Sequence, residues 1–254
     1  MSSRTAPLGG TPTVAGSQDP HQRTMVRPRI VMVALVLACV PVLVNVGARI
    51  GNAPEHGWLG SGSAGEIGND FAVFYTAGAL ILDRSPELLY DMDQFQAAYA
   101  EATGKDPAAF GTMFGNPPAF AIAMAPLSLL PWEAAWIAWT VVGLAALALA
   151  LKALGLNGVL PIWGIVLLSP LGYLAVTSGQ SSFAWLLVVA LVFFMLDRGS
   201  VTGAGLVAGL LIVKPPLLVG LGLWWVLDRR MRPALAAAGL SASAVVLGLS
   251  LIHI

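Results

Sequence analysis

The hydrophobic positions of this chain form long blocks that are interrupted by polar residues at only a few places. The first block, residues 30–48, has 19 residues without a formal charge before Arg49, which is long enough for one membrane crossing. After Pro118, the stretches 119–130 and 134–151 have the composition of apolar helices and are separated by the sequence PWE. The later blocks are 153–196, 201–213, 215–227 and 233–254. The pattern therefore predicts an all-α protein, a polytopic transmembrane helical bundle.

The uncharged block 153–196 is too long for one crossing, because it contains 44 residues. Pro161, Pro170 and the sequence TSGQSS interrupt it. Irregular backbone at membrane depth is tolerated where it lines a cavity, because backbone polar groups that face lipid stay unpaired. We therefore expect broken helices beside a cavity in this part of the chain.

The segment 50–117 differs from the blocks around it because it is acidic. It holds nine acids and two bases, a net charge of about −7. The tail 1–29 is rich in Ser, Thr, Pro and Gly and carries several arginines, and we interpret it as a disordered cytoplasmic tail. A basic tail stays inside, so the acidic segment should form an outer loop of a transmembrane domain that covers residues 30–254.

The first part of this outer loop contains a predicted helix that ends near Leu82. Asn69 or Asp70 can cap its beginning, since both side chains accept hydrogen bonds from free helix amides. We expect this helix to lie along the membrane surface, with one face in lipid or against the bundle. The residues that share this face at helical spacing are Phe71, Phe74, Tyr75 and Gly78.

A second helix of the outer loop has a start signal and a stop signal. Asp91 can cap it, with Gln94 at the third helical position. Gly104 is the expected stop, because glycine adopts the left-handed conformation that ends many helices. Such a helix is also predicted to be interfacial.

Composition supports a membrane protein and excludes several other classes. The chain is 57% hydrophobic and 10% charged, with a mean hydropathy of +0.80. The net charge is zero, so bulk charge gives no case for nucleic-acid binding. Cys39 is the single cysteine, which excludes a disulfide framework. The three histidines, His21, His56 and His253, are too far apart in sequence for a known ligand motif, so no metal site is predicted.

The basic residues of the second half suggest a topology. The cluster of Arg229, Arg230 and Arg232 should be cytoplasmic, and so should Arg198. These assignments send Lys214 to the outer side. A strict count of crossings from the first helix does not agree with them, so one of the short segments 201–213 and 215–227 is a candidate re-entrant segment.

Asp70 is the strongest candidate for chemistry, and two interpretations stay open. It can simply begin a helix, where an acid is stabilised by the amide-rich end. It can also act as a general base at the boundary between membrane and water, where an acceptor hydroxyl can reach it.

Three further polar positions stand out among apolar surroundings. Lys214 can hold a phosphate or extend to the interface, since a lysine near the membrane needs a partner or solvent. Gln180, within SGQSS, can donate hydrogen bonds to a ligand or satisfy a helix break. Asn116, within FGNPPAF, either contacts substrate or belongs to a rigid helix entry set by the two prolines.

The ordered set of motifs resembles glycosyltransferase family 87, polytopic mannosyltransferase-like proteins of the GT-C fold. The resemblance covers about residues 30–240 and rests on NDFAVFYTAGALIL, LLYDMDQF, FGNPPAFAIAMAPLSLLP, SGQSSF, DRGSVTGAGLVAGLLIVKPP and a basic turn. It implies a polyprenyl-phosphate sugar donor, often mannose, and acceptors assembled outside the cytoplasmic membrane. It also implies an essential acid in the first outer loop, and Asp70 holds the matching position. Members of the family extend further, so we expect this chain to be truncated.

The chain departs from the family pattern at three places that bear on donor and acceptor specificity. Asn116 precedes the Pro-Pro step, where an aromatic residue is common. Pro216 follows Lys-Pro, where glutamine is common. Ser181 and Ser182 follow Gly-Gln, where a polar residue and asparagine are common.

These observations together predict an inverting hexosyltransferase of the bacterial cytoplasmic membrane, with its active site at the extracytoplasmic face. Asp70 is the expected general base, Lys214 and Gln180 contact the donor phosphate, and Tyr75, Tyr90 and Asn116 are further substrate contacts. The expected partners are a lipid-linked sugar donor, a glycolipid or glycan acceptor and membrane lipids, without nucleic acid, and no cofactor or metal is expected.

Two other classes of protein fit parts of the pattern. A transporter or lipid flippase also needs broken helices and intramembrane polar residues, but it often contains internal repeats, and none is evident here. A non-catalytic scaffold of an envelope-assembly complex is the third interpretation. The concentration of acids in the outer loop favours surface chemistry over both.

Overall fold

The computed structural model describes residues 44, 67–106, 113–156, 166–167 and 169–252. The described residues belong to one unit, Ala38–Ile254. The predicted cytoplasmic tail 1–29, the first predicted crossing 30–48 apart from residue 44, and Pro161 lie outside the described residues.

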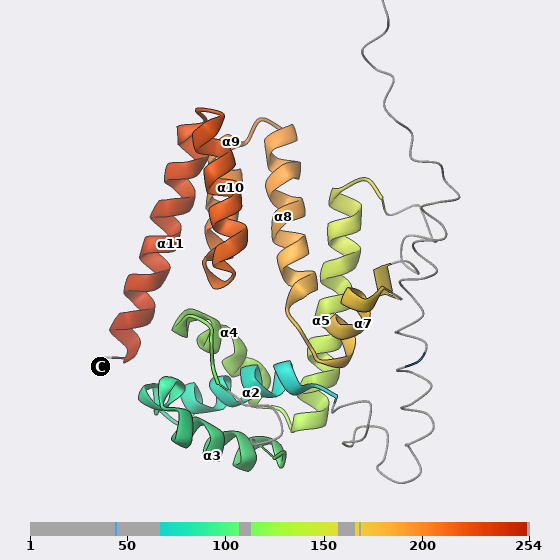
Figure 1. Cartoon of the computed structure of the whole chain (residues 1–254), viewed down its shortest axis with the longest axis vertical. Coiled ribbons are helices and arrows are strands. Elements are labelled where there is room, and N and C mark those ends of the chain that lie inside the picture. Colours follow the sequence, from blue (N-terminus) through green and yellow to red (C-terminus); the bar gives the residue numbers. More distant parts are fainter. Residues whose placement is uncertain (1–43, 45–66, 107–112, 157–165, 168, 253–254) are drawn as a thin grey trace, which may run out of the picture. The chain divides into compact units, whose positions relative to one another are not determined.

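The described residues form helices and no strand, which confirms the all-α prediction (Figure 1). In chain order the helices are α2 (Asn69–Leu82), η1 (Pro86–Tyr90), α3 (Met92–Thr103), α4 (Pro118–Ser128), α5 (Trp132–Ala153), α7 (Pro170–Thr177), α8 (Ser182–Asp197), α9 (Val201–Gly209), η3 (Leu210–Val213), α10 (Pro215–Leu227) and α11 (Met231–Ile252). Helix α5 begins at Trp132, earlier than predicted, because Pro131 of the PWE sequence is its N-cap residue.

The start and stop signals of α3 act as predicted. The Asp91 carboxylate accepts a hydrogen bond from the Gln94 backbone N–H at 3.1 Å. Gly104 follows the helix with φ +68°, in the left-handed region. Local side-chain chemistry therefore sets both ends of this helix.

The predicted cap of α2 is wrong. Gly68 precedes the helix with φ +77°, and both Asn69 and Asp70 lie inside the first turn without a capping hydrogen bond. The free amides at this end instead donate to carbonyl oxygens that follow α7. The N–H groups of Asp70 and Phe71 donate to the Ser178 oxygen at 2.9 and 3.1 Å. A distant segment thus replaces the local cap.

Helix α2 is a core helix, and its predicted face lies against the bundle, which is one of the two environments expected for that face. Its predicted face packs on aromatic rings of the bundle. The Phe71 ring lies 5.5 Å from that of Trp132 and 5.7 Å from that of Trp139. The opposite face is covered as well, since Thr76 and Leu80 are buried. Enclosure on nearly all sides fixes the position of the residues that α2 carries.

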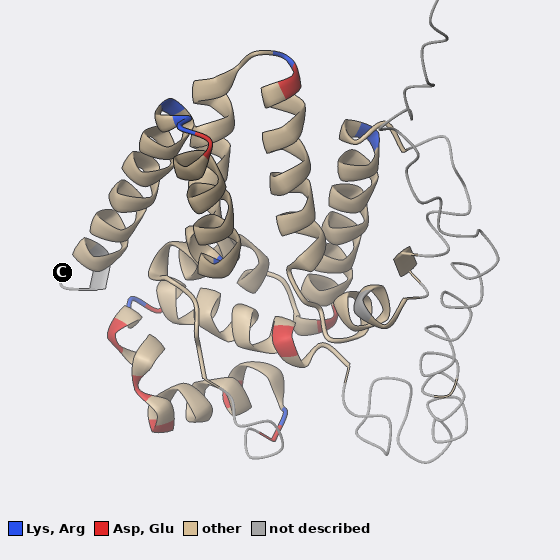
Figure 2. Ribbon diagram, turned by 45° about the horizontal axis from the view of Figure 1, so that its top comes forward, with Lys and Arg blue, Asp and Glu red and all other residues tan. Residues whose placement is uncertain are grey.

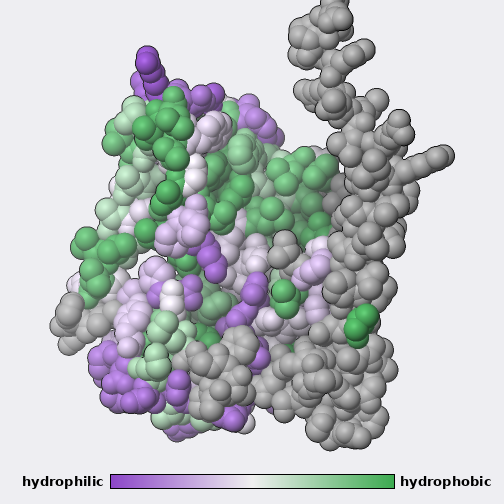
Figure 3. Space-filling model, viewed as in Figure 1, coloured by the Kyte–Doolittle hydropathy of each residue, from purple (hydrophilic) through white to green (hydrophobic). Residues whose placement is uncertain are grey.

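Helices α5, α8, α9, α10 and α11 lie side by side and run roughly parallel or antiparallel (Figure 1). Among the described residues, the stretches Trp132–Ala153 and Met231–Ser250 are long and apolar enough to cross a membrane. In space-filling view, hydrophobic residues cover α8–α11 between hydrophilic ends, and hydrophilic residues gather over α3 (Figure 3).

Helices α9 and α10 form a hairpin whose two arms are shorter than a membrane crossing. Each arm, Val201–Val213 and Pro215–Leu227, has 13 residues, so it is about 20 Å long against the 30 Å of a hydrocarbon core. Glycines let α9 approach α11 closely, since a Cβ atom at Gly205 would meet the backbone of Pro233. Lys214 lies at the tip of the hairpin, between η3 and α10.

Charged residues divide between the two ends of the described bundle (Figure 2). Basic residues gather at one end of the bundle, where α5 ends and where the α8–α9 and α10–α11 connections lie. Two aspartates, Asp197 and Asp228, lie at the same end. Most of the acidic residues lie at the other end, around α2 and α3.

Candidate active site

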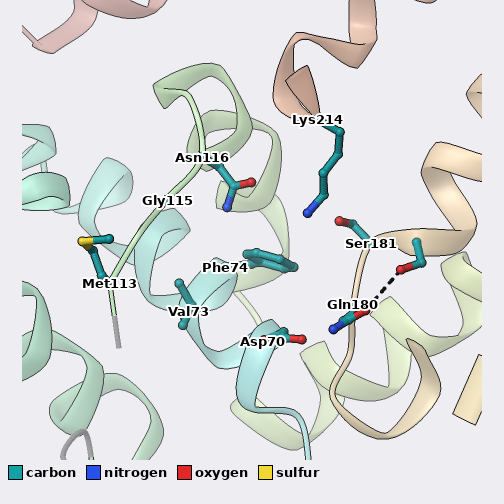
Figure 4. Close-up of a pocket in the computed structure, with 10 residues that line it drawn as sticks. Asp70, Val73, Phe74, Met113, Gly115, Asn116, Gln180, Ser181 and Lys214 are labelled. Carbon is teal, nitrogen blue, oxygen red and sulfur yellow. Dashed lines mark hydrogen bonds between the residues drawn. The ribbon is translucent and has the colours of Figure 1, made fainter. Parts of the chain in front are cut away.

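A cavity of about 330 Å³ lies where four segments of the chain meet, and its volume is within the range of small-molecule sites. The four segments are the start of α2, the loop before α4, the connection between α7 and α8, and the tip of the α9–α10 hairpin. Each contributes one polar residue singled out from the sequence (Figure 4). These residues are Asp70, Asn116, Gln180 and Lys214.

Asp70 lies in the first turn of α2 and is half-buried. Among the residues that the structure describes, it forms no ion pair, and no arginine lines the cavity. Both interpretations of this residue agree with its position: its carboxylate is at the amide-rich end of a helix, and it also borders a cavity. A carboxylate without a fixed cationic partner is free to accept a proton from a ligand.

Gly179 places Gln180 beside Asp70. Gly179 has φ +71°, a conformation that L side chains rarely adopt. Its carbonyl oxygen accepts a hydrogen bond from the Trp139 indole N–H at 2.7 Å. The Ser182 hydroxyl in turn donates to the side-chain oxygen of Gln180 at 3.3 Å. The SGQSS sequence is therefore a turn that α2 and α5 hold in place.

Lys214 reaches the cavity from the hairpin tip (Figure 4). Its backbone, at φ −126° and ψ 73°, is outside the helical region, as expected for a residue that precedes a proline. Pro215 and Pro216 then occupy the first turn of α10. The Pro-Pro step thus ends one helical arm, starts the next, and leaves the lysine at the turn.

Asn116 lies in the extended segment before α4 and faces the cavity (Figure 4). Pro117 is the N-cap residue of α4. The Tyr90 hydroxyl donates a hydrogen bond to the Asn116 carbonyl oxygen at 2.8 Å. The two prolines restrict the backbone of the Asn116 segment, and this hydrogen bond holds it against η1.

The structure does not bring Tyr75 and Tyr90, the two predicted sugar contacts, into this cavity. The Tyr75 hydroxyl donates to the Leu130 carbonyl oxygen at 2.8 Å, and its ring lies 5.5 Å from the Trp132 ring. Burial raises the pKa of the Tyr90 phenol, whose hydroxyl is engaged by Asn116. Both tyrosine hydroxyls thus connect elements of the fold, Tyr75 to the turn that follows α4 and the exposed Tyr90 to the segment before α4.

The sequence left several residues of the site unassigned. Phe74 and Val73 give the cavity apolar walls. Ser181, which belongs to the predicted SGQSS stretch, lines the cavity with a hydroxyl that accepts from the Trp185 indole N–H at 2.7 Å. Trp139 holds the Gly179 turn from α5. A buried tryptophan usually finds a partner for its indole N–H, but the sequence indicates neither which tryptophan of α5 does so nor which carbonyl group accepts the hydrogen bond.

The cavity combines an acidic and a basic side chain that are not paired with each other. A carboxylate on α2 and an ammonium group on the hairpin line one cavity, with amide and hydroxyl groups beside them. No ion pair joins Asp70 to Lys214 among the described residues, so both charges are available to a ligand. Such a cavity can accept a proton at one place and hold an anion at another.

Comparison with known families connects this chain to one of them. The family model described as Glycosyltransferase family 87 matches residues 114–253, more than half of the 254 residues. The matched range includes Asn116, Gln180 and Lys214, whereas Asp70 precedes it. Comparisons with curated proteins and with solved structures gave no match.

Proposed function

This chain belongs to glycosyltransferase family 87. From that premise we propose that the protein transfers a hexose, with mannose as the proposed sugar, from a polyprenyl-phosphate donor. The reaction takes place in the cavity that Asp70 and Lys214 line. The acceptor is a hydroxyl group of a glycolipid or glycan. The observation that carries the proposal is the meeting of Asp70 with Gln180 and Lys214 around one cavity. Asp70 lies outside the range that the family model matches, so its place beside the matched residues is independent support.

In the proposed reaction, Lys214 holds the donor phosphate. As the bond between the anomeric carbon and the phosphate oxygen breaks, the electron pair stays on that oxygen, and the lysine stabilises the resulting charge. Gln180 adds a hydrogen bond from its side-chain amide, whose oxygen already accepts from Ser182. The product on this side is the polyprenyl phosphate, which leaves without taking up a proton.

On the other side of the cavity, Asp70 acts as the general base. The acceptor oxygen forms the new bond to the anomeric carbon while its proton passes to the Asp70 carboxylate. Attack opposite to the leaving phosphate inverts the anomeric configuration. The location of the acid and the cation on separate elements, α2 and the hairpin, supports this division of roles.

The hairpin also suggests where the lipid part of the donor lies. Helix α10 starts next to Lys214 and presents exposed apolar side chains along its length, among them Leu217, Val219 and Leu223. An isoprenoid chain attached to a phosphate at Lys214 can follow this surface. The donor phosphate and its tail would then be held by one segment of the chain.

We place the protein in the bacterial cytoplasmic membrane as a multi-pass protein, with the acidic end outside. The basic residues at the opposite end of the helices then satisfy the preference of lysine and arginine for the cytoplasmic side (Figure 2). In this orientation α9 and α10 form a re-entrant hairpin, which explains how Arg198 and Arg229 share one side while Lys214 faces the other. The cavity then opens toward the outer face.

The experiment that tests the proposal is a transfer assay. Membranes that contain the protein are given radiolabelled polyprenyl-phosphate mannose, and the label in lipid and glycan fractions is compared with that from membranes without the protein. The proposal predicts protein-dependent label in a product with inverted anomeric configuration, and no transfer from a nucleotide-activated mannose. Movement of the labelled lipid across the membrane without transfer would support a flippase, and neither activity would support a scaffold.

A further inference from the structure

Ser181 occupies the N-cap position of α8 without capping the helix. Its backbone is at φ −76° and ψ 12°, and its hydroxyl accepts no hydrogen bond from the amides of α8. It accepts instead from the indole N–H of Trp185 at 2.7 Å. Ser169 shows the usual arrangement at the start of α7, where its hydroxyl accepts from the Gly172 N–H at 3.1 Å. A serine at an N-cap usually serves the helix amides, so Ser181 has a different task.

The hydroxyl hydrogen of Ser181 has no acceptor among the residues that the structure describes. The hydroxyl of Ser169, by comparison, also donates to the Val166 carbonyl oxygen at 2.7 Å, so that both of its functions are satisfied within the protein. Ser181 is only 5% exposed, and a hydroxyl in such a position normally donates as well as accepts. Its hydrogen is therefore available to a group that enters the cavity.

The Ser181 hydroxyl is directed toward Lys214. Ser181 lines the cavity, and in the close-up view its side-chain oxygen points toward the end of the Lys214 side chain (Figure 4). Among the described residues, the two groups make no hydrogen bond to each other. An ammonium group only donates hydrogen bonds, and the serine has its donor function left. The start of α8 and the tip of the hairpin thus present two donors to the same part of the cavity.

The surroundings of this pair of donors favour an anion. Helix α8 begins directly after Ser181, and the start of a helix carries partial positive charge. The carboxylate of Asp70 comes from α2, and in the close-up view the Phe74 ring lies between it and the pair (Figure 4). A sugar hydroxyl could accept one of the two hydrogen bonds but would not balance the charge of Lys214. A phosphate offers several oxygens and a negative charge, so it satisfies both donors.

We propose that Ser181 is a further contact of the donor phosphate and donates its hydroxyl hydrogen to a phosphate oxygen that Lys214 also binds. The inference rests on the proposed function, which supplies the phosphate-bearing donor. Trp185 is a positioning residue, because its indole N–H occupies the oxygen of the hydroxyl and directs the hydrogen into the cavity. The hydrogen stays on Ser181 throughout. Its bond to the phosphate strengthens as the bond to the anomeric carbon breaks and negative charge collects on the phosphate oxygens.

The test is an NMR titration of the whole protein in a phosphorus-free detergent. Farnesyl phosphate and inorganic phosphate are followed by their phosphorus signals, and farnesol, which has the same tail without the phosphate, is followed by its proton signals. Ser181→Ala should weaken farnesyl phosphate binding about tenfold or more, the usual effect of losing a hydrogen bond to a charged group, and should leave farnesol binding unchanged. Trp185→Phe removes the indole N–H and should weaken farnesyl phosphate binding severalfold, again without an effect on farnesol.

Ser169→Ala is the matched control for Ser181→Ala. Ser169 is also an N-cap serine, but its hydroxyl is fully engaged within the protein and lies outside the cavity. This variant loses a helix cap, so it should melt at a lower temperature than the wild type. It should still bind farnesyl phosphate like the wild type.

Unchanged binding of farnesyl phosphate in Ser181→Ala overturns the inference, and so does the absence of binding to the wild type. An equal loss of farnesyl phosphate and farnesol also overturns it, because the variant then disturbs the fold or the surface for the tail. If only the KM for the sugar donor rises in Ser181→Ala, the hydroxyl contacts the sugar and the inference is wrong. Binding of inorganic phosphate indicates that the phosphate alone is recognised, and binding of farnesyl phosphate alone indicates that the tail contributes; both support the inference when Ser181→Ala weakens them.

The proposed function and this inference can fail separately. Binding of farnesyl phosphate that depends on Ser181, without any sugar transfer by the wild type, supports the phosphate contact while contradicting the proposed function. Sugar transfer by Ser181→Ala with the kinetic constants of the wild type has the opposite meaning, since it agrees with the proposed function and overturns the inference.

Discussion

The backbone of Gly179 packs so closely against Phe71 that a Cβ atom at residue 179 would lie 2.5 Å from the Phe71 Cβ atom. The Gly179 carbonyl is held from the other side by the Trp139 indole. This contact joins the α7–α8 turn to α2 and α5. It therefore determines that Gln180 and Asp70 line the same cavity.

Substitution of Gly179 by alanine should damage both stability and activity. The positive φ alone costs an L residue about 1–2 kcal/mol, and the contact with Phe71 adds to this cost. We expect Gly179→Ala to lose at least tenfold in transfer rate, because the displaced turn moves Gln180 away from Asp70. Gly199→Ala is the matched control, since Gly199 has φ +75° but open space around it. Gly199→Ala should lose only the stability that the positive φ costs and should keep its transfer activity. Equal losses of stability and of transfer rate in the two variants would contradict the packing argument.

The α9–α11 contact should be equally sensitive to size. A Cβ atom at Gly205 meets the Pro233 backbone and the Ala236 side chain, so Gly205→Ala should lower the free energy of unfolding by about 1–3 kcal/mol. The same change at Gly220, in the middle of α10, meets nothing within 4 Å and should stabilise by up to about 1 kcal/mol. Thermal unfolding of both variants in nanodiscs measures the difference. A Gly205→Ala variant as stable as Gly220→Ala would show that the hairpin does not depend on this close approach.

The elements that the sequence predicted well are those set by local chemistry. Asp91, Gln94 and Gly104 define the ends of α3 through contacts within a few residues, and the structure confirms them. The proline pair after Lys214 correctly placed the start of α10. Such signals are visible in a sequence because the partner of each group is a near neighbour.

The features that the sequence missed depend on partners far along the chain. The amides of α2 are capped by Ser178, which is more than a hundred residues away, so neither Asn69 nor Asp70 was needed as a cap. The Tyr75 hydroxyl is engaged by Leu130, which a helical-face argument does not reveal. The candidate site shows the same division: the polar residues were visible as exceptions in apolar surroundings, whereas Gly179 and Trp139 act only through the tertiary contact between them.

Lys214 should determine how the donor is used. Lys214→Met removes the cation and should raise the KM for the polyprenyl-phosphate donor at least tenfold and lower kcat, with little change in the KM for the acceptor. Lys214→Arg keeps the charge and should retain part of the activity. Lys152→Met, at the exposed end of α5, is the control and should behave like the wild type. Initial rates at varied donor concentration give the answer, and unchanged donor dependence in Lys214→Met would remove the lysine from the phosphate site.

The cap of α3 should make stability depend on pH. Hydrogen bonds from the backbone and side chain of Gln94 hold the pKa of the Asp91 carboxyl below its usual value of 3.8. A carboxyl with a lowered pKa stabilises the folded state above its unfolded pKa, and this contribution is lost as the pH falls through the folded pKa. Asp91→Ala should therefore melt at a lower temperature than the wild type at pH 7, and the difference should shrink below about pH 4.

Asp91→Asn separates the charge from the hydrogen bond at this cap. Asparagine also caps helices but does not titrate, so this variant should be more stable than Asp91→Ala at pH 7 and should lack the change below pH 4. Melting curves of the three proteins between pH 3 and pH 7 test both statements. Parallel curves for all three would show that the cap contributes nothing through its ionisation.

The most direct test of the account is the transfer rate of Asp70→Asn, a change that keeps the size of the side chain and removes the base. The variant should insert and melt like the wild type and should still bind the polyprenyl-phosphate donor, while the rate of sugar transfer falls by about 10²- to 10⁴-fold. Glu87→Gln, which neutralises an exposed acid of the same acidic segment 50–117 outside the cavity that Asp70 and Lys214 line, should transfer at the wild-type rate. Transfer by Asp70→Asn at the rate of Glu87→Gln would contradict the claim that this carboxylate accepts the proton of the acceptor.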